Sequence, residues 1–235
     1  MAVAVITGGS RGLGRALTEG LLAEEENWSV VIDGRGAEAL AATAADLAGA
    51  GAGAGTIVAI AGDVTDPRHR RALVDAARDL GGLDLLVNNA SVLGPSPQPR
   101  LGEYPLDVLR HVFEVNVVAP LALIEEALPA LRRADNGRIV DVTSDAAVEP
   151  YEGWGGYGSS KAALDQVSAI LAAEEPTLRV WAVDPGDLRT QLHQEAFPGE
   201  DISDRPEPET VIPALLALIR SDRPSGRVRL TEVQS

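Results

Sequence analysis

The residues that decide the fold run from Val3 to Gly14 and read Val-Ala-Val-Ile-Thr-Gly-Gly-Ser-Arg-Gly-Leu-Gly. The apolar part, residues 3–6, has no polar side chain, which is typical of a strand buried on both faces of a parallel sheet. The glycines permit left-handed backbone angles, and the helix that follows directs unpaired N–H groups toward a ligand. The stretch therefore predicts a strand, a tight turn and a helix that together hold a diphosphate.

The spacing of the glycines separates two kinds of phosphate-binding loop. It reads Thr-Gly-x-x-x-Gly-x-Gly from Thr7 to Gly14, which differs from the commoner G-x-G-x-x-G of dinucleotide folds. Gly9 and Gly14 have the spacing of a nucleotide-triphosphate loop, but Arg15 and Ala16 stand where that loop needs Lys and Ser or Thr. The triphosphate interpretation fails, and the alternative to a dinucleotide site is a glycine-rich turn that binds nothing.

Length and composition narrow the class of protein. The 235 residues are 45% hydrophobic, and we expect a single α/β domain over 1–235. The net charge of −15 opposes binding to nucleic acid, because such binding rests on Lys and Arg that neutralise phosphates. The chain has no cysteine, which fits a reducing compartment. Its start lacks a basic leader and no apolar run approaches the roughly 18 residues of a membrane span, so we expect a cytoplasmic protein without a membrane partner.

Short apolar runs alternate with helical patterns along the chain. The runs predict strands at 3–6, 28–32, 56–60, 83–87, 137–142, 178–183 and 227–230. The helical patterns between them cover 13–25, 37–47, 67–80, 106–133, 157–175 and 211–219. This alternation predicts a Rossmann-type, doubly wound parallel sheet of about seven strands with helices on both faces, and a ligand at the carboxyl ends of the strands.

Three further segments carry structural expectations. The Gly-Ala alternation at 49–55 predicts a flexible loop without catalytic side chains. Pro120 interrupts the helical pattern and is expected to bend the helix. Residues 189–209 are acidic, rich in proline and without periodicity, which predicts either a substrate lid or a plain surface loop.

Polar residues follow the predicted strands at their carboxyl ends. Asp33 and Arg35 follow the second strand, where a dinucleotide fold selects the free ribose 2′-OH with a carboxylate or the 2′-phosphate with an arginine. Asp63, Asn89 and Ser91 follow the next two. Helix capping and turn chemistry are the alternative interpretation of these residues.

Tyr157 and Lys161 lie four residues apart at the start of a predicted helix and share one of its faces. The pKa of a free tyrosine is about 10, and a nearby ammonium favours the phenolate. The pair therefore indicates acid–base chemistry, although such a pair is more often a solvated helix face. Asn116 in an apolar helical stretch needs buried partners, in the core or in a site. Ser144 follows a strand and is either a cap or a site residue. His69, His111 and His193 are isolated, and no metal site is expected.

In this order, the motifs resemble those of the short-chain dehydrogenases/reductases over nearly the whole chain. The turn of residues 7–14 resembles the cofactor turn of the family, and Asn88-Asn89-Ala90 resembles its Asn-Asn-Ala-Gly element. Pro185-Gly186 with Thr190 resembles the segment that closes on the nicotinamide. The catalytic tetrad of the family is matched, with Ser and Tyr thirteen positions apart, by Asn116, Ser144, Tyr157 and Lys161.

The resemblance implies an oxidoreductase in which a hydride moves between a nicotinamide and a small carbonyl or secondary alcohol. It implies that Tyr157 exchanges the proton, that Ser144 holds the substrate oxygen, and that Lys161 binds the nicotinamide ribose and lowers the pKa of the tyrosine. It assigns to Asn116 a water that relays protons. The cofactor contacts implied in the same way are Gly8, Ser10, Arg11, Gly12, Leu13, Gly14, Asp33, Gly34, Arg35, Asp63, Val64, Asn89, Ala90, Tyr157, Lys161, Pro185, Gly186 and Thr190.

The resemblance favours NADP over NAD. Gly34 stands where NAD-preferring members carry an acid, and Arg35 and Arg11 stand at the basic positions of NADP-preferring members. Asp33 is one residue early for the NAD role. Ser91 departs from the family by replacing the last glycine of Asn-Asn-Ala-Gly.

The helices that hold Asn116 and Tyr157 are where such enzymes pair, so a homodimer or homotetramer is expected. The usual Val-Asp-Gly-Gly ending is missing, and we expect tetramer contacts there to be altered. Two alternatives remain: a sugar-nucleotide epimerase or dehydratase, which shares Tyr-x-x-x-Lys but is usually longer, and a non-catalytic dinucleotide-binding regulator, which would be expected to lose the tetrad.

Overall fold

The structure is a computed structural model that describes residues 1–25, 27–50 and 55–233. Its centre is one parallel sheet of seven strands in the order β3-β2-β1-β4-β5-β6-β7. The predicted doubly wound Rossmann-type sheet is thereby confirmed. The strands are β1 (Ala2–Ile6), β2 (Trp28–Gly34), β3 (Ile57–Ala61), β4 (Leu85–Asn88), β5 (Arg138–Val142), β6 (Arg179–Asp184) and β7 (Gly226–Arg229).

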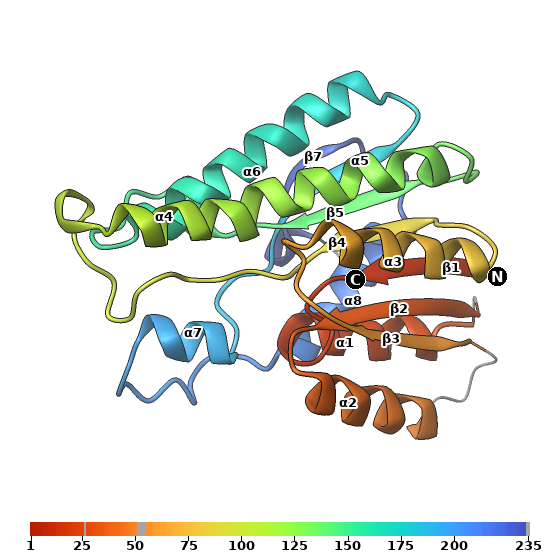
Figure 1. Ribbon diagram of the computed structural model, residues 1–235, viewed down its shortest axis with the longest axis horizontal. Helices are drawn as coiled ribbons and strands as arrows, with labels where there is room; N and C mark the ends of the chain where they lie inside the picture. Colours follow the sequence, from red (N-terminus) through yellow and green to blue (C-terminus); the bar gives the residue numbers. More distant parts are fainter. Residues whose placement is uncertain (26, 51–54, 234–235) are drawn as a thin grey trace.

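Helices cover both faces of the sheet (Figure 1). One face carries α1 (Gly12–Ala23), α2 (Ala37–Ala50) and α8 (Ile212–Arg220). The other carries α3 (Pro67–Asp79), α4 (Leu106–Phe113), α5 (Ala119–Leu131) and α6 (Gly155–Glu174). The short α7 (Gln191–Ala196) stands apart from both layers, beyond the carboxyl ends of the strands (Figure 1).

Successive residues of β1 explain why both faces need helices. Ala4 and Ile6 belong to the core under α1 and α8, whereas Val3 and Val5 belong to the core under α3, α5 and α6. All four are at most 1% exposed. A strand without polar side chains is stable only between two apolar layers, which is the condition that the first residues of the chain predict.

The order of the strands determines where the ligand site lies. Chain connections run to one side of β1 through β2 and β3, and to the other side through β4. The crevice outside the carboxyl ends of β1 and β4 is therefore the topological switch point, where open α/β sheets bind ligands. The glycine turn that follows Ile6 opens into this crevice.

The long helical stretch 106–133, in which Pro120 is expected to cause a bend, is irregular just before that proline. The helix is interrupted by a π-helical turn at Glu114–Val118, which lies before Pro120 and contains Asn116. Pro120 is the second residue of α5, and because α5 continues directly from the π-helical turn, its missing N–H leaves the helix one hydrogen bond short at this point. A π-turn widens the helix by one residue and is frequent at functional sites. The residue expected to need special partners thus sits at the irregular turn.

The segment 189–209 contains α7 and leads into a 3₁₀ turn at Pro208–Val211. Of the predicted Gly-Ala loop at 49–55, residues 51–54 lie outside the described part of the chain. Among the described residues, no helix is both long and apolar enough to cross a membrane.

Candidate active site

The crevice at the carboxyl ends of the strands contains a cavity of about 740 Å³. It is lined by the glycine turn, by residues that follow β2 to β6, and by the start of α6. All residues that the sequence assigned to the cofactor and to catalysis line it except Gly14 and Asn116. Gly14 and Asn116 lie behind the wall of the cavity, in contact with residues that line it.

The glycine turn has the shape of a phosphate cradle. Gly8 and Gly12 have φ angles of +69° and +54°, which side-chain-bearing residues rarely adopt. A Cβ atom on Gly14 would lie 2.5 Å from the carbonyl oxygen of Gly8, so only glycine permits this close packing. The side chain of Arg11 does not cap α1, and the first turn of that helix presents its N–H groups and positive dipole end at the cavity. These features fit a diphosphate.

Asp33 is placed differently from the sequence expectation of a ribose contact. Its side chain is buried inside β2, and both carboxylate oxygens are engaged within the chain. Oδ1 accepts a hydrogen bond from the Gly8 N–H at 2.6 Å, and Oδ2 lies 2.9 Å from Nε2 of His69 on α3. The strand continues to Gly34, two residues further than expected, so this carboxylate lies within the strand and supports the glycine turn.

Arg35 and Arg11 occupy the exposed rim of the cavity beside Gly34. A Cβ atom on Gly34 would lie 3.1 Å from the hydroxyl of Ser10, which leaves little room for an acidic side chain at this position. Arg11 donates to Oε1 of Gln191, so the rim also contacts α7. The rim is cationic, whereas the carboxylate of Asp33 lies beneath it.

Asp63 follows β3 and Asn89 follows β4, so the two residues line the cavity on either side of β2 and β1. Oδ1 of Asp63 accepts from the backbone and the hydroxyl of Thr65 at 2.9 and 2.8 Å. Burial by itself would raise the pKa of Asp63, but these bonds and the charges of Arg35 and His111 lower it overall. Asn89 donates to the carbonyl oxygens of Thr7 and Gly8 at 2.8 and 3.2 Å, and so ties β4 to the glycine turn.

Asn116 is fully buried, and its side-chain amide makes four hydrogen bonds. It donates to the carbonyl of Val92 at 2.9 Å and to the hydroxyl of Ser160 at 3.0 Å. It accepts from the Val92 N–H at 2.9 Å and from the hydroxyl of Ser91 at 3.1 Å. The π-turn thus fixes the loop after β4 against α6, and the amide reaches the serine that replaces the glycine of the family motif.

Ser144 follows β5 and begins a 3₁₀ turn at Asp145–Ala147. Its hydroxyl donates to Oδ1 of Asp145 at 2.9 Å and accepts from the Ala146 N–H at 3.2 Å. The other carboxylate oxygen of Asp145 accepts from the exposed hydroxyl of Tyr151 at 2.9 Å. The turn therefore holds the serine side chain at the edge of the cavity.

Tyr157 is buried, and its pKa is raised rather than lowered in the chain itself. Burial is the main cause, and the carboxylates of Asp145 and Asp184 add to it, while a hydrogen bond with the hydroxyl of Ser91 acts in the opposite direction. The ammonium of Lys161 lies 5.6 Å from the centre of the tyrosine ring. The expected lowering of the tyrosine pKa by the lysine is therefore absent from this structure, in which burial raises that pKa.

Lys161 is 2% exposed and donates from Nζ to the carbonyl of Val142 at 2.8 Å. Burial lowers its pKa from 10.5 to about 8, although the carboxylates of Asp141 and Asp165 favour its charged form. Asp141 itself is buried within β5, where it accepts from Asn88 and Ser168, each at 2.7 Å. Burial therefore destabilises the charged form of Lys161.

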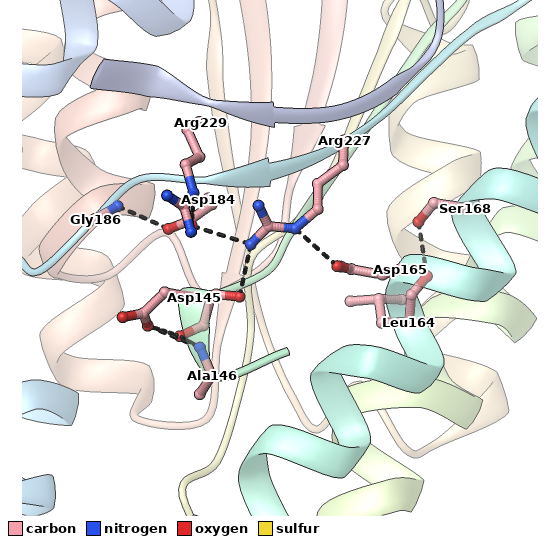
Figure 2. A network of polar contacts seen from close by, with 10 residues as sticks. Asp145, Ala146, Leu164, Asp165, Ser168, Asp184, Gly186, Arg227 and Arg229 are labelled. Carbon is pink, nitrogen blue, oxygen red and sulfur yellow. Dashed lines mark hydrogen bonds and ion pairs between the residues drawn. The ribbon is translucent and has the colours of Figure 1, made fainter. Parts of the chain in front are cut away.

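Four charged residues near the catalytic side chains were missed from the sequence. Asp165 lies one helical turn after Lys161, Asp141 lies between two valines of β5, and Asp184 ends β6. Figure 2 shows Arg227 on β7 reaching toward Asp165 and Asp184. An aspartate within a buried strand, such as Asp141, could have been noticed in the sequence. Arg227 on β7 lies too far along the chain from its aspartate partners for a sequence pattern to pair them.

The segment after β6 approaches the glycine turn from the opposite side. Gly186 has a φ angle of +77°, and its N–H donates to Oδ1 of Asp184 at 3.0 Å. Thr190 caps α7 by accepting from the His193 N–H at 3.2 Å. A Cβ atom on Gly12 would lie 3.5 Å from the methyl carbon of Thr190, so the threonine side chain covers the glycine turn. Among the described residues, no group of three His, Asp or Glu side chains could hold a metal ion.

Comparison with known proteins agrees with this geometry. The family model described as short chain dehydrogenase matches residues 2–201. A benzil reductase ((S)-benzoin forming) of Saccharomyces cerevisiae is 35% identical over 199 residues, which cover 82% of this chain and 74% of the yeast protein. Sepiapterin reductase of Mus musculus is 33% identical, with 83% and 77% covered. A rhamnolipid-biosynthesis 3-oxoacyl-[acyl-carrier-protein] reductase of Pseudomonas aeruginosa is 39% identical, with 81% and 74% covered.

Solved structures superpose over almost the whole chain. A short chain dehydrogenase of Pseudomonas syringae has a TM-score of 0.88 at 30% identity, covering 97% of this chain and 93% of its own. A short chain dehydrogenase of Shigella flexneri, in complex with NADP, has a TM-score of 0.85 at 26% identity, covering 98% and 97%.

Proposed function

Because this chain belongs to the short-chain dehydrogenase family of oxidoreductases, we propose that it interconverts a small carbonyl compound and a secondary alcohol with NADPH as the preferred cofactor. The observation that carries the proposal is the cavity in which Tyr157, Ser144 and Lys161 meet the glycine turn. A nicotinamide cofactor bound there would supply the hydride chemistry. The chain supplies orientation, charge stabilisation and the proton.

We assign the proton to the hydroxyl of Tyr157, which donates it to the substrate oxygen during reduction and removes it during oxidation. The hydroxyl of Ser144 lies on the same side of the cavity and donates to that oxygen as negative charge develops. In the structure this hydroxyl donates to Asp145, and it would exchange that partner for the substrate. The raised pKa of Tyr157 keeps the phenol protonated at neutral pH, which suits it as an acid.

Lys161 and Asn116 have supporting roles in this proposal. Lys161 would bind the nicotinamide ribose, and the positive charge of its ammonium, 5.6 Å from the centre of the Tyr157 ring, would favour the phenolate. The four hydrogen bonds of the Asn116 amide hold Val92 and Ser91 in place. Asn116 thus shapes the wall through which a relay water would reach the lysine.

The preference for NADPH rests on the rim of the cavity. The arginines at 11 and 35 can neutralise a 2′-phosphate, and Ser10 crowds the position where an acid would hold a free 2′-OH. The solved Shigella flexneri relative is complexed with NADP. A lower kcat/KM with NADPH than with NADH would overturn this preference.

The substrate end of the cavity has an apolar wall. Trp154 packs edge-on against Tyr157 with ring centroids 5.9 Å apart, and Leu192 and Ala196 from α7 pack beside them. This wall supports a substrate whose carbonyl carries an aromatic or aliphatic group. The segment 189–209, which supplies α7, is proposed as the part that adapts to the substrate within a single NAD(P)-binding domain.

The test is a panel of aromatic and aliphatic ketones, diketones and alcohols, monitored by nicotinamide absorbance with both cofactors. Cofactor binding is measured separately by calorimetry. Reduction of a ketone by wild type, together with its loss in Tyr157→Phe, is the expected result. Absence of heat with every pyridine nucleotide, or full activity of the phenylalanine variant, would contradict the proposal.

We also propose that two copies pair through α4, α5 and α6. The exposed apolar side chains include Leu106 on α4, Val118 and Leu121 at and after the π-turn, and Ile170 on α6, and these are 38–63% exposed. Sedimentation that shows only a 24.5 kDa species would contradict pairing.

A further inference from the structure

One arginine of the last strand reaches three segments that carry the site (Figure 2). Arg227 donates from Nε to Oδ2 of Asp165 at 3.0 Å. It donates from Nη2 to the backbone carbonyl of Ser144 at 2.9 Å and to Oδ2 of Asp184 at 3.0 Å. We call Arg227, Ser144, Asp165 and Asp184 the Arg227 network. None of them is adjacent to another in the sequence.

Each contact leads directly to a part of the active site. The Ser144 carbonyl belongs to the residue whose hydroxyl faces the substrate. Asp165 lies on α6, one turn after Lys161. Asp184 accepts from the Gly186 N–H at 3.0 Å and so holds the turn that covers the nicotinamide end of the cavity. A planar guanidinium can donate in these separate directions with fixed angles, which an ammonium on a flexible stem cannot do.

The network also balances charge beneath the site. Asp184 is among the carboxylates that hold the pKa of Tyr157 up, and Asp165 is among those that favour the charged form of Lys161. The side chain of Arg227 is 26% exposed, and those of Asp165 and Asp184 are 16% and 4% exposed, so the pairs are partly shielded from water. The charged groups that act on the tyrosine–lysine pair or on these carboxylates are Asp141, Asp145, Asp165, Asp184, Arg227 and Arg229.

We propose that Arg227 is a positioning residue for the reaction: it sets the backbone of Ser144, the turn at Gly186 and the charge around the Tyr157–Lys161 pair at the same time. The inference rests on the proposed function, since its effect is read through catalysis. It goes beyond that function because it gives β7 a role in positioning the catalytic tetrad, although β7 carries no residue of the tetrad.

The test compares three variants with wild type in alcohol oxidation over a range of pH. In Arg227→Gln the carboxylate of Asp165 loses its arginine partner and that of Asp184 keeps only the longer contact with Arg229, so the pKa of Tyr157 rises further. We expect kcat to fall by about tenfold or more, and the alkaline rise of kcat to move upward by roughly half to one pH unit, with a much smaller change in KM.

Arg227→Lys keeps the positive charge but lacks the planar guanidinium with its several fixed N–H donors. We expect the pH midpoint to stay near that of wild type while kcat falls at least about threefold. The matched control is Arg229→Gln, because Arg229 lies on the same strand, is 41% exposed and contacts Asp184 only at 3.5 Å. We expect its kcat to stay within about twofold of wild type. Circular dichroism and cofactor affinity establish that each variant is folded.

The outcomes separate the two proposals. If wild type oxidises no alcohol and reduces no carbonyl in the panel, the proposed function fails, and the inference fails with it. If wild type is active and Arg227→Gln keeps both its kcat and its pH midpoint, only the inference fails. An effect of Arg229→Gln as large as that of Arg227→Gln would also overturn it. If Arg227→Gln does not fold and Arg227→Lys does, a kcat of the lysine variant within about twofold of wild type would also overturn the inference.

Discussion

The two sides of the cavity are built by different means. The glycine turn between β1 and α1 is shaped by backbone angles and close approach, as at Gly14, where any side chain would collide with the carbonyl of Gly8. The catalytic side is shaped by buried polar side chains from segments far apart in the chain, including Asn116 and Lys161. A backbone cradle needs small residues at fixed spacing, whereas a side-chain site needs each buried polar group to find its partner. The first kind is local, and the second depends on the whole fold.

The largest effect on the catalytic side is expected from Tyr157→Phe. Removal of the hydroxyl removes the proton donor and leaves the ring, with its packing against Trp154, in place. We expect kcat to fall by about 10³-fold, with cofactor affinity within about threefold of wild type. Single-turnover kinetics and calorimetry measure the two quantities. A variant that keeps a tenth of the wild-type kcat would show that the proton comes from elsewhere.

Lys161→Met tests the claim that the catalytic side carries buried charge at the expense of stability. We expect activity to fall about 10²-fold or more and the free energy of unfolding at neutral pH to rise by roughly 1 to 3 kcal/mol, since methionine is uncharged and of similar length.

The pH dependence of that stability has a definite sign. The folded pKa of Lys161 is about 8, below the ordinary 10.5, so between these values the unfolded chain binds more protons than the folded chain. The contribution of this lysine to stability therefore increases as the pH rises from about 8 to 10.5. Urea unfolding of wild type should show this increase, and Lys161→Met should lack it. Parallel curves for the two proteins would refute the assignment.

Gly14→Ala tests the backbone cradle in the same way. The added Cβ atom would lie 2.5 Å from the Gly8 carbonyl and 2.6 Å from Nδ2 of Asn89, so the turn has to move. We expect the Kd of the cofactor to rise at least about tenfold and stability to fall by about 1 to 3 kcal/mol. Gly49→Ala in α2 is the control, since its Cβ atom would meet nothing within 4 Å. Equal behaviour of the two variants would remove the argument for close approach.

Arg35→Ala tests the cationic rim rather than the cradle beneath it. We expect kcat/KM with NADPH to fall about tenfold and that with NADH to change by less than about threefold, because only the former carries the 2′-phosphate. The ratio of the two values is the measurement. An equal loss with both cofactors would mean that the arginine supports the fold of the rim and does not select the cofactor.

The smallest effect is expected from Ser91→Gly, which restores the glycine of the family motif. The hydroxyl of Ser91 lies between the Asn116 amide and Tyr157, where it lowers the tyrosine pKa. Without it, we expect the alkaline rise of alcohol oxidation to move upward by a few tenths of a pH unit, with kcat changed about twofold. A shift toward lower pH would have the wrong sign for this contact.

The sequence predicted the elements around the cradle well because they depend on short spacings. The order of strand, glycines and helix from Val3 to Gly14 is the observed one, and Tyr157 and Lys161 share a helix face by their spacing alone. The doubly wound sheet followed from the alternation of apolar runs with helical patterns. The irregularity of 106–133 was expected from Pro120, but the π-turn before it and the partners of the Asn116 amide on other segments could not be read from the sequence.

What the sequence alone determined is therefore the family and the fold class, together with the candidate reacting groups, each of which is encoded within a few neighbouring residues. Only the tertiary structure decided the environment of those groups. It turned Asp33 inward onto Gly8, raised the pKa of Tyr157 by burial, and paired Arg227 with Asp184 by placing β7 beside β6. Such effects depend on the distance between residues that are tens of positions apart, and that distance is fixed only when the strands align.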